Sequence, residues 1–473
     1  MIRQNGNFIN KNSINKITKR KNKDYSISLD YVSEDIGTLD IPKIAYKDFS
    51  EIKGKGLLDY VVNIGVDFGN SSTKIVYSRE TKKNSLNKKN EGLELNCEEL
   101  NILLKDNIPQ SIISLDLIDN GKIKIDNFKL NLLDKLSNLS VDDIYKQNEY
   151  YFCIYYIACL LQFAKFSIIK EQMLEKRINR IEWNINMGMP SDGKVGNSKI
   201  KKVFRKILST AICLSSNSKL LSPKGINLLK WKDLCDKEIE INHDFSYVNF
   251  EVYPELYAEA LNLYESDNDP GERAIIVDVG SVTLDITFIL KIKDIYSNKT
   301  NIILLNPNVL PLGMEKLIAK NNELCYGNSY NTLKSFADIC FEKDIPKLST
   351  YIKKNYGELI AKFYKDSSSY FDLKNDNDYK FYWFGGARDA SFIKQLFLEP
   401  FKKNSYLYNI KPLYQPNFSK KKNEKNFRYS VAYGLILADS YINHPSVSYV
   451  AVGEKTVNYS ENLLATQQNI YGN

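Results

Sequence analysis

Two segments of this chain, far apart in the sequence, share one design: a strand of β-branched residues, an aspartate, a turn of small residues and a second strand. The first is YVVNIGVDFGNSSTKIVY, residues 60–77, and the second is AIIVDVGSVTLDITFIL, residues 274–290. β-Branched residues favour strands, and Gly and Asn tolerate the backbone angles of tight turns. One such segment predicts only an ordinary β-hairpin, whereas two copies predict two related half-domains, each organised around a hairpin.

The first turn carries groups that suit a phosphate ligand. Successive backbone N–H groups in a small-residue turn can form an anion nest, and the hydroxyls of Ser71 and Ser72 lie within it. Lys74 adds a positive charge, and Asp67 at the end of the strand can hold a hydrated Mg²⁺. The spacing differs from a Walker A loop, which needs a Gly-Lys-Ser/Thr ending.

The positive charge of the chain is concentrated at its start. The 473 residues are enough for more than one domain and carry a formal charge of +8. Residues 1–23 contain seven basic and no acidic side chains, so the remainder is nearly neutral. This distribution argues against a generally basic nucleic-acid surface. We expect residues 1–23 to be a mobile, solvated segment; the alternative is an arm that contacts DNA, an acidic surface or a neighbouring subunit.

Cysteine and histidine usage argues against a metal cluster or histidine-based catalysis. The seven cysteines form no C-x-x-C pair, and the two histidines are far apart. Dispersed cysteines and the lack of a signal-peptide pattern predict a cytoplasmic protein. The most apolar run, residues 151–164, is shorter than the ~20 residues of a membrane span and predicts a buried helix.

Periodicity and turn residues predict the elements around the two hairpins. A strand at residues 250–253 leads into Pro254 and Glu255, which begin a helix; proline and an acid are both typical of a first helical turn. Further strands are predicted at residues 108–117, 122–125, 181–187 and 380–384, and further helices at residues 141–180, 199–208, 387–396 and 430–440.

With these motifs in this order, the sequence resembles the actin-like ATPase superfamily, and most of all the ParM-type plasmid-segregation actins. The resemblance covers about residues 60–442. It implies an α/β fold of the actin-like ATPase type, with two related α/β domains and a nucleotide cleft between them. Residues 1–59 would form an N-terminal extension, residues 60–263 and 427–473 domain I, and residues 264–426 domain II.

The resemblance also assigns roles to residues. It implies ATP, with GTP as the alternative nucleotide, and Mg²⁺ held by Asp67 and Asp278 through water. Glu255 would orient the attacking water and act with Asp278 in catalysis; its structural alternative is an acid that merely begins the helix. The residues implied in nucleotide binding are Asp67, Gly69, Asn70, Ser71, Ser72 and Lys74 in the first hairpin, Gly280, Ser281, Val282 and Thr283 in the second, and Gly313, Glu315, Gly385, Gly386 and Ala387 beside the nucleoside.

Three functions compete on this fold. The first is a ParM-like actin, an ATPase that polymerises with itself and moves plasmid DNA through a DNA-binding adaptor, without membrane contact. The second is a stand-alone ATPase like the heat-shock chaperones, whose substrate-binding domain has no counterpart in residues 445–473. The third is a sugar kinase, for which no acceptor-activating aspartate is identifiable. The hairpin sequences and the Pro254–Glu255 corner favour the first.

Overall fold

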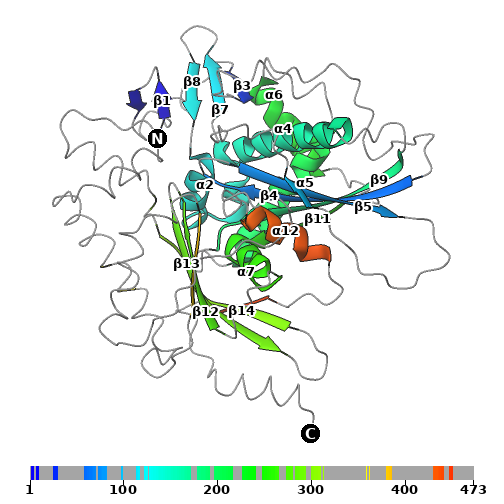
Figure 1. The fold of residues 1–473 in the computed structure, drawn as a ribbon. Coiled ribbons are helices and arrows are strands. Elements are labelled where there is room, and N and C mark those ends of the chain that lie inside the picture. The colour runs from blue at the N-terminus through cyan, green and yellow to red at the C-terminus, as the bar shows by residue number, and fades with distance from the viewer. Residues whose placement is uncertain are drawn as a thin grey trace, which may run out of the picture.

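The fold comes from a computed structural model (Figure 1). It describes residues 2–4, 7–9, 25–29, 58–70, 73–82, 97–99, 113–117, 122–125, 127–171, 178–191, 197–216, 226–240, 248–265, 273–280, 283–293, 300–310, 313, 358, 362, 380–385, 430–440 and 447–450.

The first predicted hairpin lies at the centre of a five-stranded sheet, named here the first sheet. In spatial order its strands are β11 (Val248–Pro254), β9 (Ile178–Met189), β4 (Leu58–Phe68), β5 (Thr73–Lys82) and β6 (Cys97–Glu99). The hairpin strands β4 and β5 are antiparallel, whereas β9 and β11 run parallel to β4. The carboxyl ends of β4, β9 and β11 therefore lie at one edge of the sheet, the edge that carries Asp67 and Glu255.

The second predicted hairpin lies at the centre of the second sheet. In spatial order its strands are β15 (Lys380–Phe384), β12 (Arg273–Val279), β13 (Leu284–Lys293), β14 (Thr300–Leu310) and β16 (Val447–Val450). As in the first sheet, an antiparallel hairpin has a parallel strand on one side and an antiparallel strand on the other. The prediction of two related α/β halves is confirmed at this level. The assignment of residues 427–473 to domain I is wrong for residues 447–450, because β16 pairs in parallel with β14.

A third, six-stranded sheet contains part of the N-terminal segment. Its strands are β10 (Ile226–Asn227), β3 (Tyr25–Leu29), β7 (Ile113–Leu117), β8 (Lys122–Ile125), β1 (Ile2–Gln4) and β2 (Asn7–Ile9). The predicted hairpin across residues 118–121 is confirmed by the antiparallel register of β7 and β8. The expectation of a mobile segment at residues 1–23 is wrong for β1 and β2, because β1 pairs with the open edge of β8. Basic composition concealed the strand-forming residues among them.

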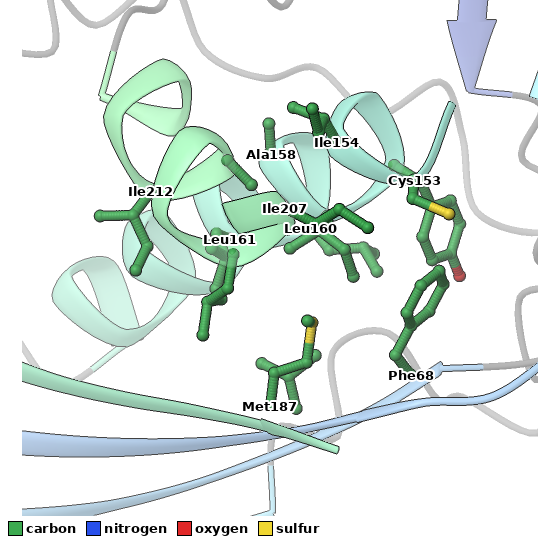
Figure 2. Packing of buried hydrophobic residues seen from close by; sticks show 14 of the residues in the cluster. Phe68, Cys153, Ile154, Ala158, Leu160, Leu161, Met187, Ile207 and Ile212 are labelled. Carbon is green, nitrogen blue, oxygen red and sulfur yellow. The ribbon is translucent and has the colours of Figure 1, made fainter. Parts of the chain in front are cut away.

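Two helices cover one face of the first sheet and form the main core (Figure 2). Alternate residues of β4, namely Val62, Ile64, Val66 and Phe68, are fully buried beneath α4 (Asn148–Glu171) and α5 (Asn197–Ser215). The predicted helix over residues 141–180 is instead α3 (Val141–Ile144) followed by α4, and β9 already begins at Ile178. Parallel pairing of Leu58 with Ile178 extends both strands beyond their apolar patterns. Two further helices, α2 (Phe128–Leu136) and α6 (Leu228–Glu240), flank this core. Within the described residues, no helix is long and apolar enough to cross a membrane.

A crossed pair of helices joins the two sheets (Figure 1). Helix α12 (Ser430–Ser440) lies against the first sheet, where a Cβ on Gly65 would come within 2.1 Å of the Ala432 carbonyl oxygen. Helix α7 (Glu255–Glu265) shares a buried cluster with the second sheet. The helices touch at Gly434, where a Cβ would lie 1.7 Å from the Ala258 carbonyl oxygen. Each sheet thus contributes contacts to one helix, and the helix pair is the link between them.

Candidate functional site

The first hairpin ends in a buried ion pair. Asp67 lies opposite Lys74 in the β4–β5 register, and the Lys74 ammonium lies 2.8 Å from Asp67 Oδ2. The Asp67 side chain is 8% exposed and that of Lys74 is 18% exposed. The turn begins with a hydrogen bond of 3.1 Å from the Gly69 N–H to the Asp67 carbonyl oxygen. The buried Asn70 Oδ1 receives no hydrogen bond. The turn therefore holds one neutralised carboxylate and an open amide oxygen.

The second hairpin ends in two carboxyl groups instead. Asp278 lies opposite Asp285 in the β12–β13 register, and like charges directly opposite destabilise a strand pair. The Gly280 N–H donates to the Thr283 carbonyl oxygen at 2.9 Å and closes the turn. Asp278 Oδ1 and Asp285 Oδ1 are buried and receive no hydrogen bond within the described part of the chain. This hairpin requires a proton or a cation that the described side chains do not supply.

The two hairpins lie close enough to influence each other's charge. Burial raises the pKa of Asp278 to about 7, Lys74 opposes this shift, and the charges of Asp67 and Glu255 add to it. Burial also raises the pKa of Asp285 well above its ordinary value, with Glu255 and Asp278 contributing. Residues from both halves of the sequence therefore form one electrostatic cluster, as the paired motifs predicted.

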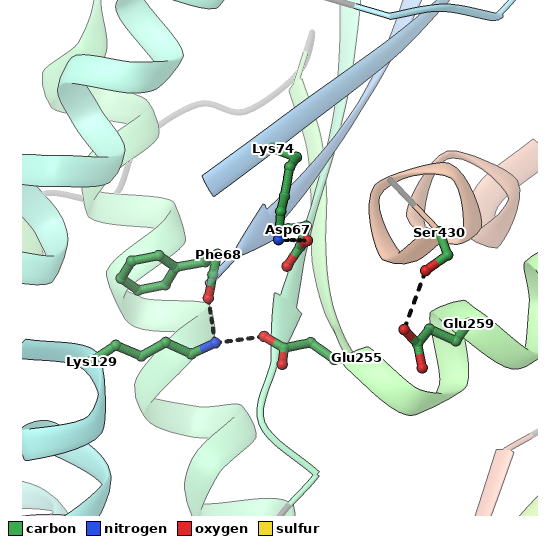
Figure 3. A network of polar contacts seen from close by, with 7 residues as sticks. All are labelled: Asp67, Phe68, Lys74, Lys129, Glu255, Glu259 and Ser430. Carbon is green, nitrogen blue, oxygen red and sulfur yellow. Dashed lines mark hydrogen bonds and ion pairs between the residues drawn. The ribbon is translucent and has the colours of Figure 1, made fainter. Parts of the chain in front are cut away.

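Glu255 occupies the corner between β11 and α7, and a lysine that the sequence analysis missed holds its side chain (Figure 3). The Lys129 ammonium lies 2.5 Å from Glu255 Oε1 and also donates to the Phe68 carbonyl oxygen. It lies 5.2 Å from the centre of the Phe68 ring, a distance typical of a cation–π contact. Lys129 thus connects the end of the first hairpin strand to the predicted catalytic carboxylate.

The surroundings of Glu255 are shaped to its side chain. Burial raises the pKa of Glu255, the adjacent Lys129 lowers it, and the charge of Asp67 raises it. A Cβ on Gly188 would lie 2.9 Å from Glu255 Cγ, so glycine at this point of β9 leaves room for the carboxylate. The prediction that Glu255 begins a helix after Pro254 is confirmed.

A second buried glutamate, also missed, lies one helical turn along α7. Glu259 is 1% exposed, and its Oε1 accepts a hydrogen bond of 3.2 Å from Ser430 Oγ at the start of α12 (Figure 3). Burial raises the pKa of Glu259 well above its ordinary value, and the charges of Asp278, Asp285 and Asp67 raise it further. No sequence pattern distinguishes Glu259 or Lys129 from the many acids and lysines of this chain.

The glycine predicted to border the nucleoside lies against the second hairpin. Gly385 has a φ of +84°, and a Cβ there would come within 2.0 Å of Asp278 Oδ1 and 2.5 Å of the Val279 carbonyl oxygen. Only glycine fits this conformation and this space. Gly313 is buried after the end of β14. The remaining predicted positions lie outside the described residues: Ser71, Ser72, Ser281, Val282, Glu315, Gly386 and Ala387.

The residues present fit a cation that is bound mainly by groups other than protein. Asp67, Glu255, Glu259, Asp278 and Asp285 lie in one cluster with two lysines, and buried carboxylate oxygens in it receive no hydrogen bond. In the described residues, no group of three carboxylate, thiol or imidazole side chains is arranged to hold a metal ion. Mg²⁺ keeps several waters and takes one or two carboxylates plus phosphate oxygens, which matches such an arrangement.

Comparisons with known proteins give matches to solved structures of actin-like proteins. The apo ParM protein of pSK41 is 13% identical, with a TM-score of 0.33, and the match covers 80% of this chain and 96% of that one. An archaeal actin homologue in complex with ADP is 14% identical, with a TM-score of 0.34, covering 80% and 98%. The Alp12 filament structure is 12% identical, with a TM-score of 0.33, covering 80% and 97%.

No family model and no curated protein sequence matches the chain. The architecture rests on its own geometry: two hairpin-centred sheets, joined by the α7–α12 pair, with both aspartate hairpins directed at the first turn of α7. This is the arrangement that the resemblance to the actin-like ATPase superfamily implies.

Proposed function

We propose that this protein is a ParM-like bacterial actin, a cytoplasmic ATPase that polymerises with bound nucleotide and segregates plasmid DNA through a DNA-binding adaptor. The observation that carries this proposal is the meeting of three parts at one point. Asp67 from the first hairpin, Asp278 from the second and Glu255 from the corner of α7 influence one another's protonation. Residues from separate parts of the chain converge here with one orienting lysine, Lys129.

Each part has a task in nucleotide binding. Asp67 and Asp278 hold a hydrated Mg²⁺, which supplies positive charge against the phosphate oxygens. Lys74 and the backbone N–H groups of both turns bind the phosphates. The nucleoside lies against the glycine turns at Gly313–Glu315 and Gly385–Ala387. The lysines offset only part of the carboxylate charge, so we expect nucleotide to bind together with the cation.

Hydrolysis needs positioning more than covalent chemistry. Glu255 orients the attacking water and accepts its proton as the bond to phosphorus forms. Lys129 keeps the Glu255 carboxylate ionised, since an opposite charge at 2.5 Å offsets the cost of burial. Its second hydrogen bond, to the Phe68 carbonyl oxygen, fixes the direction from which this charge acts.

Polymerisation is the proposed output of the ATPase. The α7–α12 pair is the described link between the sheets, and closure about it changes which surfaces of the two halves are complementary. A head-to-tail contact that does not close into a ring generates an open helical filament. Hydrolysis then weakens the contact, and an adaptor couples filament growth to plasmid DNA.

The decisive experiment is a pelleting and light-scattering series over protein concentration with ATP, GTP and a non-hydrolysable analogue. We expect polymer above a critical concentration and its loss as nucleotide is consumed. Filaments of Glu255→Gln should persist, because only hydrolysis is removed. A protein that hydrolyses nucleotide but stays monomeric throughout would contradict the segregation-actin proposal and favour the alternative, a stand-alone chaperone-like ATPase.

A further inference from the structure

Glu259 connects the helix pair to the second hairpin. Its carboxyl group is 1% exposed and is reached from two sides. On one side, Oε1 accepts the hydrogen bond from Ser430 Oγ in the first turn of α12. On the other, the Glu259 side chain makes a hydrogen bond with the Asp278 side chain at the end of β12. One buried side chain on α7 therefore touches an element packed on the first sheet and an acid of the second.

We propose that Glu259 is a positioning residue, which fixes the Asp278 carboxyl group for cation-assisted nucleotide binding. This inference rests on the proposed function, since Asp278 is the proposed cation-holding residue of the second hairpin. A carboxyl group with one buried, unpartnered oxygen rotates freely unless a neighbour holds the other side. Glu259 supplies this contact, and Ser430 in turn fixes Glu259 (Figure 3).

The geometry distinguishes this role from two others. Glu259 is not a third cation ligand, because the described carboxylates include no group of three arranged around a metal position. It is not an ordinary helix-surface acid either, since no lysine or arginine among the described residues forms an ion pair with it. Its printed hydrogen bonds are to Ser430 and to Asp278.

The position also adds a connection between the helix pair and the cation. Ser430 is the first residue of α12, and Gly434 in the same helix packs directly on Ala258, the neighbour of Glu259 in α7. A shift of α12 along α7 would therefore move the Ser430 hydroxyl relative to Glu259. Through Glu259, the orientation of Asp278 depends on how the two helices cross.

The test measures binding rather than turnover. Calorimetry would give the affinity of ADP with Mg²⁺ and with excess EDTA, and the ratio of the two is the gain from the cation. We expect Glu259→Leu to reduce this gain by about 10-fold or more, the cost typical of losing a group that orients a metal ligand. The affinity in EDTA should stay within about twofold of wild type, which reports an intact nucleotide pocket.

Two further variants keep the inference falsifiable if Glu259→Leu does not fold. Glu259→Gln still accepts from Ser430 and presents an N–H donor to Asp278, so it should keep the wild-type gain. Ser430→Ala removes the outer contact alone and should lose part of the gain. An unchanged gain in Ser430→Ala, or a loss in Glu259→Gln as large as in Glu259→Leu, would overturn the inference.

The wild-type protein separates this inference from the proposed function. No ADP binding by wild type, with or without Mg²⁺, would overturn the proposed function and this inference with it. Binding with a clear gain from Mg²⁺ in wild type, and the same gain in Glu259→Leu, would overturn this inference alone.

Discussion

The Lys129 ammonium lies 2.5 Å from Glu255 Oε1, and the same nitrogen donates to the Phe68 carbonyl oxygen at the end of β4. The Lys129 side chain is 3% exposed and that of Glu255 is 12% exposed, so this pair is largely shielded from water. Breaking a buried pair by removing one partner leaves an uncompensated charge. The proposed catalytic carboxylate is therefore held by a residue from a helix that no motif marks.

Lys129→Met should slow hydrolysis by about 10²-fold, the cost of a reacting group that is displaced by a small distance. Without the ammonium, Glu255 loses both its orientation and the charge that keeps it ionised. Phosphate release under saturating ATP and Mg²⁺ measures the effect. Lys135→Met is the matched control, because Lys135 lies on the same helix and pairs at 2.5 Å with Glu149 away from the cluster. Equal losses in both variants would assign Lys129 a merely structural role.

Glu255→Gln should spare nucleotide binding and slow hydrolysis by about 10²–10⁴-fold, the range for loss of a general base. The amide keeps the size and shape of the side chain but cannot accept the proton of the attacking water. Calorimetry with ADP and a phosphate-release assay separate the two effects. Release at the wild-type rate would leave Glu255 as an acid that only begins α7.

Gly385→Ala should weaken ADP binding and lower the melting temperature. Its φ of +84° costs a residue other than glycine roughly 1–3 kcal/mol, and the new Cβ would meet Asp278 Oδ1 at 2.0 Å. Gly280→Ala is the control in the opposite turn, since the nearest atom to its Cβ is 3.1 Å away. We expect a clearly smaller effect there by thermal melting and calorimetry. Wild-type behaviour of Gly385→Ala would mean that β15 ends differently.

The nucleotide-free protein in metal-free buffer should lose stability as the pH rises from about 4 to about 7. The pKa of Asp278 is raised from an ordinary 3.8 to about 7, so in this window the folded protein holds a proton that the unfolded chain has released. Stability falls with pH wherever the folded state binds more protons. The raised pKa values of Glu259 and Asp285 act in the same direction.

Melting temperatures across this pH range, for wild type and Asp278→Asn, test the dependence. The amide does not titrate, so the variant should show a shallower decline than wild type. A decline that is equally steep in Asp278→Asn would place the responsible proton elsewhere.

The sequence by itself determined the two hairpins and the corner at Glu255, because these depend on local chemistry. β-Branched runs, an aspartate at the strand end and glycines in the turn act within a few residues of one another, and Pro254 marks the start of α7. The need for glycine at position 385 was likewise predicted from a motif, and its positive φ confirms it. Local pattern also predicted α12 at residues 430–440 with its correct ends.

Only the tertiary structure decided which charged side chains share the cluster. Lys129 and Glu255 are joined by the packing of α2 beside β4, and Glu259 meets Ser430 only where α7 crosses α12. Such contacts depend on how elements far apart in the sequence pack, and a lysine or glutamate on a helix has the same local pattern whether it is buried or solvated. For the same reason, the pairing of β1 with β8 and of β16 with β14 was not predictable: a short strand is stabilised by its partner's open edge and not by its own residues.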